Sequence, residues 1–342
     1  MRRAAFRTGA ALCSKAHSAV RRTSHDPGGG ISMAAYFGRI GGWLYHQAYL
    51  LVALTYLFWA LNIVIGRHAM ASMPPVALSF WRWALAALIL LPFTLSYLKR
   101  DWPVIRANLG MLCILGLTGT TGYAVASYWG LQYTQAINGL LIQCTMPIII
   151  GVTTYFVVGD KLSARQMSGI AVSFFGVLMI LLRGDPDVLH AISFNRGDMW
   201  FAAAVLIFAF YSPLTRKYRP PIHPMSFLAI TIITGTLLVI PLFIWESVAI
   251  GMPTLDMHTA LIFLYMAIFP SIIAYICFNR AIQLIGPNLV AALYPLIVVF
   301  GVTLAIVFLG ERPEWYHFIG TIFIVGGVLL ATRQRRAAVA KA

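Results

Sequence analysis

One basic residue stands inside a long apolar stretch of this sequence. Arg82 lies between Trp81 and Trp83, near the start of the apolar run 76–98. A buried guanidinium without a partner is costly, so Arg82 must face a cavity, pair with another group or extend to a polar boundary. The pattern leaves two roles open: contact with a bound solute or a gate, or a structural anchor held between the two tryptophans.

Two prolines interrupt apolar runs in a way that can expose backbone carbonyls. Pro147 and Pro295 lie inside the runs 137–158 and 289–309. A proline inside a helix removes one backbone donor and frees a carbonyl one turn earlier, here near Gln143. In transporters such paired breaks point to a binding site at the middle of the bilayer, whereas the alternative is an ordinary packed kink.

Further polar and aromatic side chains lie at helical spacing within the apolar runs. Trp59 and Asn62 share one helix face, and Tyr123 and Ser127 are four residues apart on another. Each of them can bond to a neighbouring helix alone, but together they predict a polar cavity for a small amphipathic solute. The candidate cavity residues are Trp59, Asn62, Arg82, Tyr123, Ser127, Gln143, Pro147, Tyr211, Tyr275, Tyr294 and Pro295.

Metal, cofactor and ATP chemistry find no support in the sequence. The cysteines stand apart, without a CxxC pair or a histidine partner, so we expect neither a metal site nor a disulfide; they are Cys13, Cys113, Cys144 and Cys277. The phosphate-binding pattern GxxxxGK[ST] does not occur, and no cofactor is expected. No Asp or Glu lies in the middle of an apolar run, which favours indirect ion coupling or facilitated diffusion.

The elements that must position these residues are membrane helices. The 342 residues are 60% hydrophobic and 10% charged, with a mean hydropathy of +0.81, which is too apolar for a soluble domain. About 20 apolar residues are needed for a helix to cross a bilayer. We expect ten such runs, at 48–66, 76–98, 107–129, 137–158, 166–182, 199–214, 225–245, 259–278, 289–309 and 316–332.

The basic residues lie in short segments between these runs, so the net charge of +15 does not indicate a nucleic acid partner. With the amino terminus placed in the cytoplasm, cytoplasmic segments after residue 47 hold thirteen Lys and Arg residues. The opposite side holds only Arg67, Arg183, Arg196 and Arg312. This bias predicts both termini in the cytoplasm of a plasma membrane, in a bacterium the inner membrane.

The two halves of the chain resemble each other. Pro75 recurs as Pro224 and Gly169 as Gly320, at offsets of 149 and 151 residues. Five runs precede the break at 183–198 and five follow it, so the second half enters the membrane from the opposite side. The predicted fold class is an all-α membrane protein with ten transmembrane helices arranged as two inverted five-helix repeats, which permits alternating access.

This reading divides the chain into five segments. They are a basic tail at 1–47 that we expect to be disordered, a first repeat at 48–183, a linker at 184–198, a second repeat at 199–333 and a basic cytoplasmic tail at 334–342. The first tail either resembles a transit peptide or reflects a start codon upstream of Met33. Gly169 and Gly176, with Gly320 and Gly327, allow close packing in a scaffold or a homodimer face.

Two blocks of residues carry a resemblance to a known family: Trp59-Ala60-Leu61-Asn62, Gly66-Arg67, Pro74-Pro75 and Arg82, and later Pro295, Gly310-Glu311, Gly320 and Gly327. Over residues 48–333 the chain resembles EamA-type transporters of the drug/metabolite transporter superfamily. The resemblance implies ten helices in two five-helix repeats. It also implies movement of amino acids, other metabolites or drugs, often outward, through a central cavity. The chain departs from the pattern at Asp160, where Glu is commoner.

These observations favour a transporter, with a small-molecule solute and the lipid bilayer as its partners. The solute is a small polar or amphipathic metabolite, such as an amino acid, a related compound or a drug. One alternative is a membrane-embedded enzyme acting on a lipid-linked substrate, and another is a membrane sensor or scaffold without flux. The enzyme would need converging acids or histidines, and the available histidines are scattered at His68, His190, His258 and His317.

Overall fold

The computed structural model describes residues 42–69, 73–134, 139, 142–185, 187–188, 195–252, 256–309 and 312–332. Most of the basic tail expected at 1–47, with Met33, lies outside the described residues, and so do His190 and the tail expected at 334–342. The chain divides into a unit of residues 1–44 and a unit that begins at Tyr45. All helices named below belong to the second unit.

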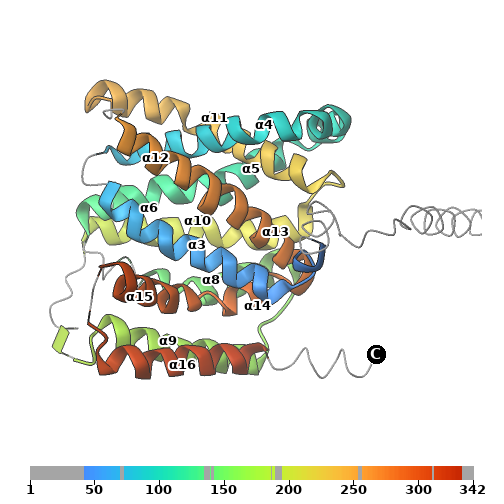
Figure 1. Cartoon of the computed structure of the whole chain (residues 1–342). Helices are drawn as coiled ribbons and strands as arrows, with labels where there is room; N and C mark the ends of the chain where they lie inside the picture. Colours follow the sequence, from blue (N-terminus) through green and yellow to red (C-terminus); the bar gives the residue numbers. More distant parts are fainter. Residues whose placement is uncertain are drawn as a thin grey trace, which may run out of the picture. The chain divides into compact units, whose positions relative to one another are not determined.

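The described residues of this unit are mainly helical and contain no β-strand. In chain order the helices are α3 (Ala48–Ala69), α4 (Pro75–Ala107), α5 (Leu109–Gly116), α6 (Gly122–Tyr133), α8 (Met146–Val158), α9 (Ala164–Leu181), α10 (Arg196–Tyr218), α11 (Pro224–Ala249), α12 (Met257–Met266), α13 (Ala274–Ile285), α14 (Pro287–Ala292), α15 (Leu296–Leu309) and α16 (Trp315–Thr332) (Figure 1). Two π-helical segments, η1 (Leu117–Thr121) and η3 (Ala267–Ile273), join α5 to α6 and α12 to α13.

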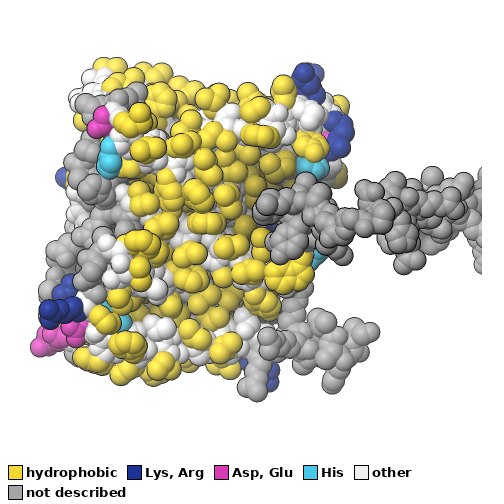
Figure 2. Space-filling model, in the orientation of Figure 1, with side chains coloured by type: hydrophobic (Ala, Val, Ile, Leu, Met, Phe, Trp, Pro, Cys, Tyr) yellow, Lys and Arg dark blue, Asp and Glu magenta, His cyan; other side chains and the backbone are white. Residues whose placement is uncertain are grey.

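Eight helices within the described residues are long and apolar enough to cross a membrane, and two shorter apolar helices cover Ala48–Ile63 and Met146–Val158. Figure 2 shows hydrophobic side chains over the middle of one face and Lys and Arg side chains at its two ends. Helices are required in lipid because every backbone polar group must bond within its own segment. The chain is therefore an all-α, multi-pass membrane protein, and the count of ten spans stays a prediction.

Local signals set several helix ends. Pro75 and Pro224 occupy the first turns of α4 and α11, where a proline loses no helical hydrogen bond. Ser163 opens α9 in a capping box with Gln166, in which each side chain accepts a hydrogen bond from the backbone N–H of the other. Helix α8 is followed by Gly159, whose φ of 88° lies in the left-handed region that favours glycine.

Helix α11 holds the start of α4 through a buried carboxylate. It continues to Ala249, past the apolar run expected to end at residue 245, and the added turn carries Glu246. This side chain is fully buried and accepts hydrogen bonds from the backbone N–H groups of Val76 (3.1 Å) and Ala77 (2.7 Å). A carboxylate at this position pairs with unsatisfied donors and with the positive end of the helix dipole.

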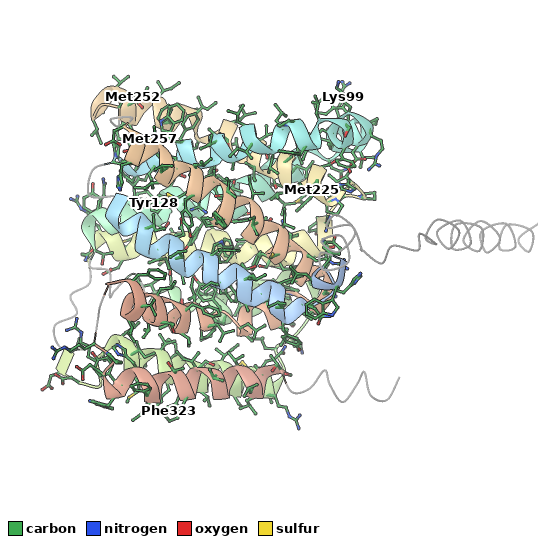
Figure 3. All side chains as sticks on the ribbon, in the orientation of Figure 1. Lys99, Tyr128, Met225, Met252, Met257 and Phe323 are labelled. Atoms are coloured by element: carbon green, nitrogen blue, oxygen red, sulfur yellow. The ribbon has the colours of Figure 1, made fainter. Side chains whose placement is uncertain are left out.

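A second carboxylate makes the reciprocal contact. Helix α4 extends to Ala107, and Asp101 in its last turns accepts hydrogen bonds from the backbone N–H of His223 (2.8 Å) and the hydroxyl of Ser226 (2.7 Å) at the start of α11. Figure 3 shows Lys99 of α4 and Met225 of α11 at the same end of the bundle. The two helices therefore lie antiparallel, and each is capped by the other.

Helices α9 and α16 pack along facing stripes of small residues (Figure 1). A Cβ atom added to Gly169 would lie 2.5 Å from the carbonyl oxygen of Gly327, and one added to Gly176 would lie 2.5 Å from that of Gly320. Ser173 between them donates a hydrogen bond to a backbone carbonyl of α16. These glycines already pack against one another between two helices of the same chain. The homodimer prediction therefore no longer rests on them.

Candidate functional site

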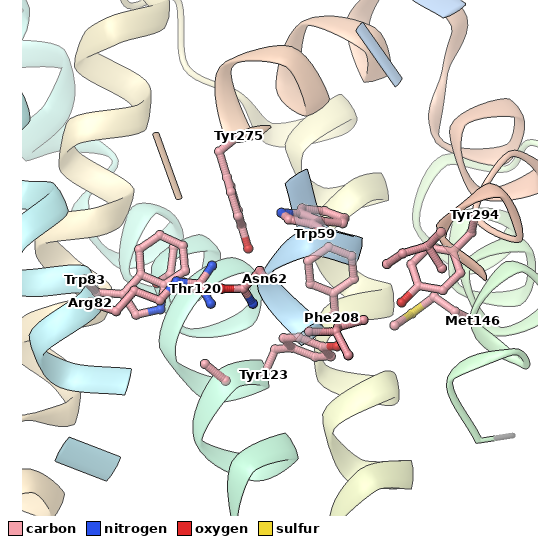
Figure 4. A pocket seen from close by; sticks show the side chains of 13 residues that line it. Trp59, Asn62, Arg82, Trp83, Thr120, Tyr123, Met146, Phe208, Tyr275 and Tyr294 are labelled. Carbon is pink, nitrogen blue, oxygen red and sulfur yellow. The ribbon is translucent and has the colours of Figure 1, made fainter. Parts of the chain in front are cut away.

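A cavity of about 60 Å³ lies between helices from both halves of the chain (Figure 4). Its wall combines aromatic, apolar and polar side chains from α3, α4, η1, α6, α8, α10, α13 and the start of α15. The lining residues are Trp59, Asn62, Ile63, Arg82, Trp83, Thr120, Tyr123, Ala124, Met146, Phe208, Tyr275, Tyr294 and Ile297. Six of the residues expected from the sequence thus line one cavity.

Arg82 is buried in the wall of this cavity and held on two sides. Its Nε donates to the hydroxyl of Ser271 at 2.7 Å, and its Nη1 donates to the hydroxyl of Tyr128 at 3.3 Å. Its Cζ lies 4.7 Å from the centre of the Trp83 ring, within the range of a cation–π interaction. Arg82 is therefore an anchored side chain that also faces the cavity.

The two π-helical segments hold aromatic residues at the cavity. The indole N–H of Trp59 donates to the carbonyl of Pro270 in η3 at 3.1 Å, and the hydroxyl of Tyr275 donates to the carbonyl of Gly119 in η1. Segment η3 begins 150 residues after η1, which matches the spacing of the sequence repeat. A π-helical turn interrupts the regular backbone pattern and is frequent at functional sites.

An aromatic cluster adjoins the cavity. Its members are Trp59, Phe208, Tyr211, Tyr275 and Phe278, and their ring centroids lie 5.1 to 6.4 Å apart in the pairs that touch. Tyr211 is fully buried and donates its hydroxyl to the Oδ1 of Asn279 at 2.8 Å. It therefore lies behind Phe208 and Tyr275 and does not itself line the cavity.

The helix breaks expected at Pro147 and Pro295 are present. Helix α8 begins with Pro147 in its first turn, and a turn that contains Pro295 separates α14 from α15. With Gln143 these prolines line a separate cavity of only about 10 Å³, and Tyr294 borders both cavities. The side-chain amide of Gln143 donates to the hydroxyl of Tyr123 at 2.7 Å, which joins the two walls.

Ser127 does not line either of these cavities. Its hydroxyl donates to the carbonyl of Ala124 at 3.0 Å, because a serine inside a helix bonds readily to its own backbone. Sequence reasoning missed the other seven lining residues of the larger cavity, which are Ile63, Trp83, Thr120, Ala124, Met146, Phe208 and Ile297. The last two carry no signal, since an apolar side chain in an apolar helix looks the same whether it faces lipid, a helix or a cavity.

The described residues show no cluster of three or more His, Cys, Asp or Glu side chains that could hold a metal ion. Their three cysteines, Cys113, Cys144 and Cys277, are free thiols, and Cys13 lies outside the described residues. The side chain of His68 and all of His190 also lie outside them.

A family model described as the EamA-like transporter family matches residues 46–182 and 195–333, which is most of the chain. The chain belongs to this family. It is accordingly a multi-pass membrane transporter for small molecules, and the family and its relatives are named as transporters and not as enzymes.

Similar proteins match this EamA-like transporter along most of their length. An "Uncharacterized transporter YyaM" of Bacillus subtilis is 27% identical over 81% of this chain and 90% of its own. A "Probable amino-acid metabolite efflux pump" of Escherichia coli K12 is 25% identical over 82% of this chain and 93% of its own. A protein of known crystal structure, 20% identical, superposes with a TM-score of 0.69 over 85% of this chain and 98% of its own, which shows a shared fold.

Proposed function

We propose that this EamA-like transporter carries a small polar or amphipathic metabolite, an amino acid or a related compound, by alternating access between two inverted five-helix repeats at 48–183 and 199–333. The observation that carries the proposal is the cavity wall, which draws Trp59 and Arg82 from the first repeat and Phe208 and Tyr275 from the second. A site shared by two repeats changes its exposure when one repeat rocks against the other.

The dimensions of the cavity support such a movement. A volume of about 60 Å³ holds only about two water molecules, which is less than a metabolite needs. Loading therefore requires the repeats to separate. The charge bias assigns Arg280 to a cytoplasmic segment. Tyr211 and Phe278 lie between the cavity and Arg280, so the aromatic cluster is the barrier that has to open.

Solute flux in proteoliposomes tests the proposal. Trp59→Ala and Tyr275→Ala should each abolish most of the flux, because both remove cavity wall and a hydrogen bond to a π-helical segment. Trp102→Ala and Tyr155→Ala are matched controls, since both side chains are about half exposed and border neither cavity. Unchanged flux in the two cavity variants, with normal membrane insertion, would remove this cavity as the transport site.

The inverted arrangement has a test of its own. Reporter tags placed after the fifth and tenth predicted spans should report opposite sides of the membrane, since five crossings separate them. We expect the tag after the fifth span outside and the tag after the tenth in the cytoplasm. Both tags on one side would contradict two inverted repeats and, with them, alternating access by this route.

A further inference from the structure

Among the described residues, the positive charge of Arg82 in the cavity wall has no ion-pair partner. Arg82 has only about 6% of its surface exposed, and no carboxylate of the described residues forms an ion pair with it. Three carboxylates are buried within the described residues, and each bonds to the start of a helix: Asp101 to α11, Asp198 to α10 and Glu246 to α4. A buried guanidinium without a counter-charge is costly unless it faces a water-filled cavity or a ligand supplies negative charge.

The guanidinium also has donors to spare. It carries five N–H bonds, and its recorded protein partners, Ser271 and Tyr128, accept two of them. The indole N–H of Trp83 beside it is buried and has no hydrogen-bond partner in the part of the chain that the structure describes. These donors belong to the wall of one cavity, so a ligand with two acceptor oxygens can bind several of them at once.

A third cavity, on the other side of the aromatic cluster, is also lined by basic side chains. It measures about 230 Å³ and is lined by Arg219, Arg280, His223 and Asn279, among other residues, and none of its lining residues is acidic. Asn279 accepts the hydrogen bond of Tyr211, so the cluster lies between the two cavities. Asp101 contacts the backbone of His223 but is already paired with Arg100 at 3.0 Å.

The cavity at Arg82 and the cavity at Arg219 and Arg280 are therefore both positively charged, and aromatic side chains separate them. A zwitterion would bring an ammonium group, for which the described lining residues offer the unpaired Oδ1 of Asn62 and aromatic faces but no carboxylate. A carboxylate attached to an apolar body fits both features, since the fork of Arg82 matches a carboxylate and Trp59, Phe208 and Tyr275 suit an apolar body.

From this geometry we infer that the solute is a net organic anion, a carboxylate with an apolar body, whose carboxylate binds Arg82. This narrows the proposed function to the related compounds that lack the ammonium group of an amino acid. The inference rests on the proposed transport function for its biological meaning, but the binding site itself can be tested without flux. Arg219 and Arg280 then form a first binding site for the same anion, in the cavity at the cytoplasmic end of the path.

Binding is measured on the purified, detergent-solubilised full chain through the fluorescence of Trp59 and Trp83, which line the cavity. The probes are phenylacetate and 4-methylpentanoate, each compared with its neutral amide and with the zwitterions phenylalanine and leucine. We expect saturable binding of at least one carboxylate, about tenfold to a hundredfold tighter than its amide, as the loss of hydrogen bonds to a charged group predicts.

Variants assign this preference to Arg82. Arg82→Gln should abolish it, and Arg82→Lys, which keeps the charge but not the fork, should retain a weaker preference. Arg106→Gln on the same helix is the control, because Arg106 is exposed in the last turn of α4 and borders no cavity described above. Each variant must elute as the wild type does in size-exclusion chromatography, and Arg82→Lys carries the test if Arg82→Gln does not fold.

Several results overturn the inference: equal binding of acid and amide, tighter binding of the zwitterions, no binding of either carboxylate, or a preference that is as strong in the Arg82 variants as in the wild type. Flux of a neutral or zwitterionic solute alongside any of these would leave the transport proposal standing. Selective carboxylate binding without flux of any probe would support the anion site and count against transport.

Discussion

Replacing Glu246 with glutamine should weaken the packing of α4 against α11. The carboxylate is fully buried and accepts two backbone hydrogen bonds, at 3.1 and 2.7 Å, from the first turn of α4. Glutamine keeps one acceptor oxygen, so about one of these bonds is lost together with the charge at the helix terminus. Hydrogen bonds to charged groups contribute about 1.5–3 kcal/mol each, and a charge at a helix terminus contributes about 0.3–1 kcal/mol.

We therefore expect Glu246→Gln to lower the free energy of unfolding by about 2–4 kcal/mol. The measurement is reversible unfolding in mixed detergent micelles, followed by circular dichroism. Glu314→Gln is the matched control, since it makes the same substitution at an exposed residue and should stay within about 0.5 kcal/mol of the wild type. Equal stability of the two variants would refute the role given to the buried carboxylate.

Three further outcomes are expected. Gly327→Ala should lower the free energy of unfolding by about 1–3 kcal/mol because its Cβ would lie 2.4 Å from the Gly169 carbonyl, whereas Gly326→Ala, with open space around it, should not; thermal unfolding compares them. The pKa of Asp256 is lowered by the hydrogen bond from the Thr259 N–H, so its contribution to stability is present above its unfolded value of 3.8 and is lost as the pH falls through the lower folded value. Amide exchange in the first turn of α12 should lose protection over that range in the wild type and not in Asp256→Asn. In proteoliposomes, a membrane potential of 100 mV should shift the steady-state distribution of a transported carboxylate by about fiftyfold and leave its neutral amide unchanged.

The membrane class and the repeat could be predicted because they depend on patterns that extend over many residues and do not depend on any single contact. Apolar runs, the positions of Lys and Arg and a constant offset between Pro75 and Pro224 are properties of the chain alone. Most of the polar candidates also reached the cavity, since a polar side chain within an apolar helix needs a partner and a cavity supplies one.

Features that depend on pairs of helices were not predictable. Glu246 and Asp101 follow the apolar runs and look like residues of a connecting segment, and only the antiparallel packing of α4 and α11 makes them caps. Ser127 shows the opposite error, since its spacing from Tyr123 suggested the cavity and its own backbone bonds it instead.

The π-helical segments escaped prediction for a different reason. Pro270 is a visible signal in η3, but the corresponding segment η1 contains no proline, so the sequence gives no matching mark in the first half. What the segments share is tertiary: each carries a carbonyl that an aromatic side chain of another helix reaches, Trp59 in one case and Tyr275 in the other.

An anionic solute would also account for the absence of Asp and Glu from the middle of the apolar runs in the sequence. Carriers driven by protons or sodium commonly place a carboxylate within the membrane. Here the buried carboxylates of the described residues, Asp101, Asp198 and Glu246, each bond to the start of a helix. A cell interior that is negative drives an anion outward by about 2.3 kcal/mol per 100 mV for each charge. Export of a carboxylate through a positive path past Arg280 and Arg82 thus needs no coupling ion, and the same potential would hold back a cation.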